Sequence, residues 1–112
     1  MIETGMVLPV LPGKREALLA FAQALMGERK AEYEQSQVSV SRESWFLQPA
    51  PQGDLCIIHF ESTDPEAVFT GLATSQEPFD IWFRAQVLDI TGVDLTQPSA
   101  GLPPRIFHWA RI

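Results

Sequence analysis

Hydrophobic residues fall at alternate positions in several short stretches of the sequence, as expected for a β-strand with one buried face. In the first stretch, Ile2, Met6, Leu8 and Val10 share one parity. The third stretch, LCIIHFE, and the last, IFHWARI, are apolar on both parities, which predicts that both of their faces are buried. We expect strands near residues 2–10, 39–48, 54–61 and 105–112.

Two regions between these strands carry apolar residues at the three- and four-residue spacing of a helix. The first predicts a helix that follows the turn Pro12-Gly13-Lys14 and runs to about Glu34, and Gly27 weakens it locally. The second predicts a helix broken in two. Asp64 is placed to cap its first part, Ser75 to cap its second part, and Gly92 to end it in the left-handed conformation.

The resulting order is β-α-β-β-α-β, which is the ferredoxin-like arrangement of an α+β domain. We therefore expect one domain over residues 1–112, with a four-stranded antiparallel sheet, helices on one face, and the first and third strands at its centre. The other face would expose Ile57 and its parity mates. Because so large an apolar face is unusual in a soluble monomer, we expect a homodimer with sheet packed on sheet.

Composition narrows the set of partners. The net charge is −6, the sequence pI is about 4.7, and the sequence has no basic stripe, so nucleic acid and anionic membranes are not expected partners. Cys56 is the only cysteine, which excludes an intrachain disulfide and predicts a buried, unreactive thiol. The chain opens without the basic and apolar regions of a signal peptide, so we expect a cytoplasmic protein.

Four segments resemble a known superfamily. The strand that runs into Pro12-Gly13-Lys14 and a helix resembles the start of the dimeric α/β-barrel proteins, which include the antibiotic-biosynthesis monooxygenases. Residues 42–48 (RESWFLQ), 61–66 (ESTDPE) and 78–83 (PFDIWF) are similar to a bacterial domain family of unknown function within it. The resemblance covers nearly the whole chain in order. It implies a fold and a dimer but no reaction, since this superfamily hosts many functions.

His59, Glu61 and His108 are the candidates for catalysis. Each histidine lies mid-strand among apolar neighbours, so it is either a core or interface residue or a general base. Glu61 shares the parity of His59, which makes a 2-His-1-carboxylate site conceivable. Because the common metal motifs are absent, we predict no metal and no cofactor. Haem-degrading members of the superfamily use a helix histidine, which both helical regions lack, so no bound haem is expected.

Aromatic residues offer a candidate ligand site. Oxygenases of the superfamily that need no cofactor hold a substrate between sheet and helices with Trp and polar side chains. The resemblance therefore implies that Trp45, Trp82 and Trp109 could line such a pocket, and Phe79 and Trp82 stand beside the helix break where its wall could adjust. The alternative is that these rings only pack in the core and the dimer interface. Asp80 is either a carboxylate of that pocket or, as we expect, a partner of Arg84, one turn away on the outer face of the helix.

The sequence thus predicts a homodimeric α/β-barrel protein that binds a small organic molecule. The alternative is a cofactor-independent monooxygenase- or isomerase-like enzyme. A domain whose only property is assembly is the third hypothesis. No Gly-rich phosphate loop, nucleophile elbow or pair of catalytic carboxylates favours a particular reaction.

Overall fold

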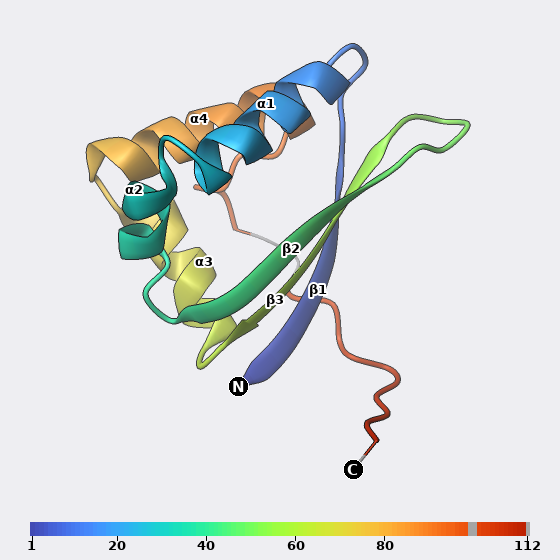
Figure 1. Ribbon diagram of the computed structural model, residues 1–112, viewed down its shortest axis with the longest axis vertical. Helices are drawn as coiled ribbons and strands as arrows, with labels where there is room; N and C mark the ends of the chain where they lie inside the picture. Colours follow the sequence, from blue (N-terminus) through green and yellow to red (C-terminus); the bar gives the residue numbers. More distant parts are fainter. Residues whose placement is uncertain (99–100, 112) are drawn as a thin grey trace.

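The stretches with alternating apolar residues form a β-sheet, and helices cover one face of this sheet. The computed structural model describes residues 1–98 and 101–111. Its elements follow the order β1 (Ile2–Pro9), α1 (Arg15–Met26), α2 (Lys30–Ser36), β2 (Val40–Gln48), β3 (Leu55–Ser62), α3 (Pro65–Thr74) and α4 (Pro78–Thr91). All four helices lie on the same side of the sheet, and α1 runs beside α4 (Figure 1). The protein is therefore an α+β fold.

The sheet is antiparallel, with strand order β1-β3-β2. The inner face, toward the helices, carries the apolar parity of each strand. Cross-strand rows on this face include Leu8–Cys56–Leu47 and Met6–Ile58–Trp45. The parity predicted for the first strand is confirmed, because Met6 and Leu8 pack against the core and Val10 is buried in it.

Both helical regions are broken. The break between α3 and α4 is confirmed at Ser75–Glu77, whereas the prediction of a single helix after Lys14, running to about Glu34, is wrong. Its first part ends at Met26, and a second helix begins at Lys30. Gly27 adopts φ −120° and ψ −103°, far from helical values, so the residue expected only to weaken the helix interrupts it. Gly92 ends α4 at φ 76°, as predicted.

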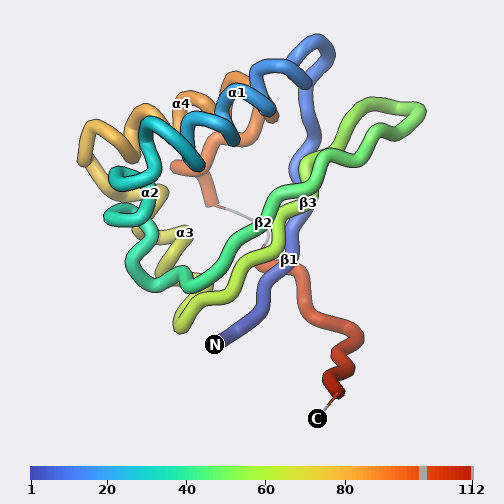
Figure 2. Tube along the Cα trace, viewed as in Figure 1, coloured from blue at the N-terminus to red at the C-terminus, as the bar shows by residue number. Residues whose placement is uncertain are grey.

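The predicted fourth strand is absent from the described residues. Residues 101–111 form neither a strand nor a helix, so the expectation of a strand near residues 105–112 is wrong for this part of the chain. Consequently β3 is central and β1 lies at an edge of the sheet, rather than beside a fourth strand. The segment of residues 103–111, here called the C-terminal tail, passes the outer face of the sheet and extends beyond it (Figure 2).

The N-terminus of α3 is capped by a side chain. The side chain of Asp64 accepts a hydrogen bond of 3.1 Å from the Ala67 backbone N–H, as the sequence predicted. Replacing Asp64 by Ala removes this acceptor and is expected to lower the free energy of unfolding by about 1 kcal/mol in a urea titration. Asp64→Asn is the matched control, since Asn caps equally well. An equal loss of stability in both variants would contradict the capping role.

Candidate functional site

A small cavity lies between the inner face of the sheet and the helices. Its volume is about 60 Å³ and its lining is almost wholly apolar. All three strands contribute to it, as do α1, α2, α3 and α4. A volume of this size holds a few water molecules but is smaller than the ~150 Å³ of an engineered cavity that takes benzene. An organic ligand larger than about 60 Å³ must therefore widen this cavity.

One carboxylate faces this apolar cavity. Glu43 has the inward parity of Trp45 and Leu47, and it lies opposite Phe60 of β3. The pairing shifts by one residue between Val40 and Arg42, and this bulge lets both Val40 and Glu43 face inward although their numbers differ in parity. The local irregularity of β2 therefore positions Glu43 against the cavity.

Two aromatic side chains hold this carboxylate in place. The Trp45 indole Nε1–H donates to Glu43 Oε2 at 2.7 Å, and the Tyr33 hydroxyl donates to Oε1. Burial, followed by the nearby Glu43 charge, raises the pKa of Tyr33 far above its usual value, so this hydroxyl remains a donor at ordinary pH. Each carboxylate oxygen retains a further acceptor position. The arrangement can therefore receive one more N–H or O–H group.

Cys56 lines the same cavity and is 2% exposed. Burial, with a smaller contribution from the Glu43 charge, raises the pKa of its thiol. The protonated thiol is a poor nucleophile, so the prediction of a buried thiol is confirmed and covalent chemistry at Cys56 is disfavoured.

The three predicted ligand-binding residues take different places. Trp45 lines the cavity, whereas Phe79 and Trp82 lie in a neighbouring cluster of stacked and tilted rings. Phe21 is the hub of that cluster, and its ring centroid lies 5.5 Å from those of both Trp45 and Trp82. The Arg29 guanidinium covers the Trp82 ring at 4.0 Å from its centroid.

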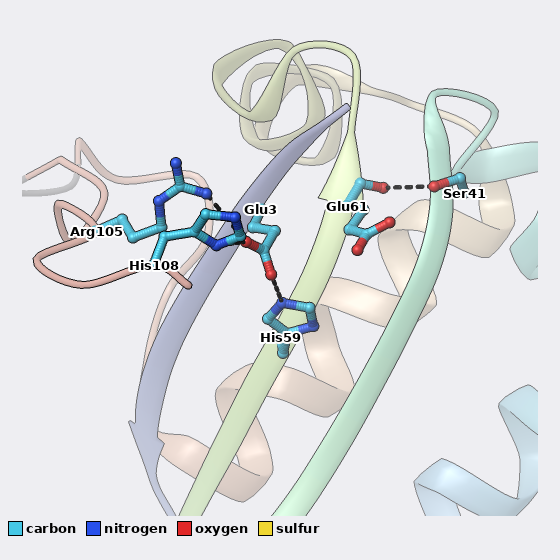
Figure 3. Close-up of polar contacts among 6 residues, drawn as sticks. All are labelled: Glu3, Ser41, His59, Glu61, Arg105 and His108. Carbon is cyan, nitrogen blue, oxygen red and sulfur yellow. Dashed lines mark hydrogen bonds and ion pairs between the residues drawn. The ribbon is translucent and has the colours of Figure 1, made fainter. Parts of the chain in front are cut away.

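The predicted catalytic residues lie on the opposite face of the sheet. His59 and His108 approach each other through Glu3 of β1 (Figure 3). His59 Nε2 lies 3.2 Å from Glu3 Oε2, and His108 Nδ1 lies 3.2 Å from Oε1. Arg105 Nη1 also donates to Oε1, at 3.0 Å. Glu61 is on the same face but stands apart from these contacts, and its backbone carbonyl accepts from Ser41 (Figure 3).

This outer cluster ties the C-terminal tail to the sheet. The hydrogen bond with His59 is the largest influence on Glu3 and lowers its pKa; desolvation opposes the shift and Arg105 adds to it. Because the pKa of Glu3 is lowered, its carboxylate stays charged as pH falls below the usual carboxyl range. The contacts of Glu3 with the tail are therefore lost only when pH passes the lowered pKa. Among the described residues, no group of three or more His, Cys, Asp and Glu is arranged to hold a metal ion.

Asp80 is not where the sequence placed it. Its side chain is buried at 7% exposure, and its carboxylate accepts from the hydroxyls of Ser36 and Ser75, the latter at 2.6 Å. Arg84 instead donates to the backbone carbonyls of Leu72 and Ser75 at 2.8 and 2.7 Å. The predicted pair on the outer helix face is therefore wrong, because the break before α4 turns Asp80 toward the end of α2.

No known family model matches this chain, and no curated protein is similar enough in sequence to indicate a family. In the described part of the chain, no helix combines the length and apolar character that a membrane span requires. The site must therefore be interpreted from its own geometry.

Sequence reasoning missed Glu43, Tyr33 and Glu3. A signal for Glu43 was present, because a carboxylate stands on the same parity as Trp45 and Leu47 of an otherwise apolar strand face. A charge at such a position must find partners or an open cavity. Tyr33 carried no comparable signal, because the sequence alone does not show that its hydroxyl reaches Glu43 across the turn between α2 and β2.

Proposed function

We propose that this protein binds a small, mainly apolar organic molecule in the cavity between sheet and helices, with Glu43 as its polar anchor. The observation that carries the proposal is a carboxylate held by Tyr33 and Trp45 against an otherwise apolar lining. Ligand sites commonly combine apolar walls with a few fixed polar groups. The Tyr33 and Trp45 donors offset the cost of placing a carboxylate against apolar side chains, and they leave acceptor positions open toward a ligand.

The free acceptor positions of Glu43 define the ligand class. A carboxylate accepts hydrogen bonds and attracts positive charge, so an amine or a hydroxyl group fits and an acidic group is repelled. The cavity of about 60 Å³ must widen for such a ligand. The helix breaks at residues 27–29 and 75–77 are the places where its helical wall can bend, because no continuous helix runs through them.

The second candidate is a cofactor-independent monooxygenase- or isomerase-like enzyme. Glu43 is the group that favours it, because a carboxylate in an apolar cavity can take a proton from a bound substrate. His59, Glu61 and His108 lie on the outer face and cannot reach that cavity without crossing the sheet. An isomerase would need Glu43 to return the proton to a second carbon, and Glu43→Gln would then abolish turnover.

The finer architecture is also part of the proposal: a cytoplasmic homodimer of ferredoxin-like α/β-barrel subunits. The order of the elements supports this proposal, because it agrees with the first five elements of a β-α-β-β-α-β chain when each broken helical region is counted once. The outer face of the sheet supports the dimer, because its row Val7–Ile57–Phe46 carries apolar side chains toward solvent. Packing two such faces together buries this row in both copies.

Paired probes of the same shape test the ligand site. Isobutylamine and benzylamine are expected to raise the melting temperature, whereas isobutyrate and benzoate are not, since only the amines complement Glu43. Glu43→Gln keeps the shape and is expected to weaken amine binding at least about tenfold in calorimetry. Glu61→Gln, which removes an equal charge from the outer face, is the matched control. Equal weakening in both variants, or no amine binding to the unmodified protein, would refute the anchor.

A further inference from the structure

A second, larger groove adjoins the cavity that Glu43 faces. Its volume is about 710 Å³, and it is open to solvent. The residues that line it belong to α2, to the turn that follows α2, to α3 and to the start of α4. The groove therefore lies between α2 and α3 at the surface of the helical layer.

Three side chains separate this groove from the cavity. Gln37, Val68 and Leu72 line both spaces, and no other described residue does so. Val68 and Leu72 lie one helical turn apart on α3, and Gln37 directly follows the end of α2. Groove and cavity thus meet at a partition made of these three residues, here called the gate.

One side of the gate is held by polar contacts rather than by buried side chains. No residue of α2 is buried, whereas α1, α3 and α4 each bury several. The hydroxyls of Tyr33 and Ser36 fasten α2 to Glu43 and Asp80, and Gln37 Nε2 donates to Ser36 Oγ at 3.1 Å. An element that buries few apolar contacts opens at low cost. The gate therefore opens on its α2 side.

The cavity alone is small for an organic ligand, but the groove beyond the gate is not. The two volumes are about 60 and 710 Å³. A ligand that places its polar head at Glu43 and passes a chain through the gate needs less widening of the cavity than one enclosed whole. Val68 and Leu72 present apolar surface at the gate, and Pro78 and Phe79 continue it in the groove. Such walls fit a hydrocarbon chain.

From this continuity we infer that the ligand is a linear alkylamine whose ammonium group binds Glu43 and whose chain extends through the gate into the groove between α2 and α3. The inference rests on the proposed function, because it takes Glu43 as the anchor of the ligand. It adds the shape of the ligand, its route of entry and the three residues through which the chain passes.

A series of linear amines tests the inference on the unmodified protein. From n-butylamine to n-octylamine, the association constant measured by calorimetry is expected to rise about two- to fourfold per added methylene, the range for half to full burial of that group. The alkyl carboxylates of equal length are the controls, because Glu43 repels them.

The outcomes of this series separate the inference from the proposed function. An association constant that stays level or falls beyond n-butylamine would overturn the inference and leave the cavity site standing. Binding of no amine, or an equal gain in the carboxylate series, would overturn both, because the first leaves Glu43 without a ligand and the second shows adsorption without an anchor.

A side chain that fills the groove supplies the second measurement. Gly71 of α3 lines the groove, and a Cβ atom added there would have no atom from another part of the chain within 4 Å. Gly71→Trp is therefore expected to weaken n-octylamine binding at least about tenfold and to leave the affinity for n-butylamine within about twofold. Thr70→Trp is the matched control, at the neighbouring exposed position outside the groove.

The comparison of the two tryptophan variants decides whether the chain occupies the groove. Full n-octylamine affinity in Gly71→Trp with an unchanged circular dichroism spectrum would contradict the inference, as would an equal loss in Thr70→Trp. If Gly71→Trp fails to fold, the amine series on the unmodified protein decides alone.

Discussion

Replacing Phe21 by Ala is expected to lower the free energy of unfolding by roughly 3–5 kcal/mol, the range for losing a buried aromatic ring. Phe21 is 4% exposed, and its ring centroid lies 5.3 Å from that of Phe83 as well as 5.5 Å from those of Trp45 and Trp82. These rings come from β2, α1 and α4, so the deleted ring leaves a void that no single element can close.

A urea titration followed by circular dichroism measures this loss. Leu19→Ala is the matched control, because Leu19 lies on the same helix and is 43% exposed. We expect the control to change stability by less than about 1 kcal/mol. A similar loss in the two variants would show that the ring cluster is not the centre of the core.

The elements that the sequence predicted well are those with local causes. Apolar periodicity places α1 and the inner faces of β1 and β3, and single residues set the helix ends at Asp64 and Gly92. These signals act over one or two turns, so neighbouring residues determine them. The bulge in β2 is different, because its register depends on the partner strand β3. The parity of Trp45 and Leu47 gives the inward position of Glu43, whereas the inward position of Val40, on the other parity, follows only from the pairing with β3.

The tail shows a second limit of sequence reasoning. IFHWARI has the composition of a strand, but a strand forms only where another strand accepts its hydrogen bonds. Local pattern gives the propensity and not the partner. The two histidines follow the same principle: the sequence gave their apolar neighbours, but their shared partner, Glu3 of β1, is evident only in the folded chain.

Replacing Ile57 by Asp is expected to dissociate the proposed homodimer without unfolding the chain. Ile57 is the middle residue of the outer row Val7–Ile57–Phe46, on the side away from the helices. In one copy alone its side chain is only half-buried, so a carboxylate there keeps much of its hydration. Between two sheet faces the same carboxylate would be unpaired and dry, at a cost of several kcal/mol.

That cost corresponds to a dissociation constant raised by about a hundredfold or more. Sedimentation at micromolar protein should give twice the chain mass for the unmodified protein and the chain mass for Ile57→Asp. The matched control is Ile81→Asp, the same substitution at a position of α4 that is 45% exposed, which should leave the dimer intact. Circular dichroism distinguishes dissociation from unfolding. A dimer that survives Ile57→Asp would place the contact elsewhere than on the sheet face, because no interface over this row can accommodate two unpaired carboxylates at its centre.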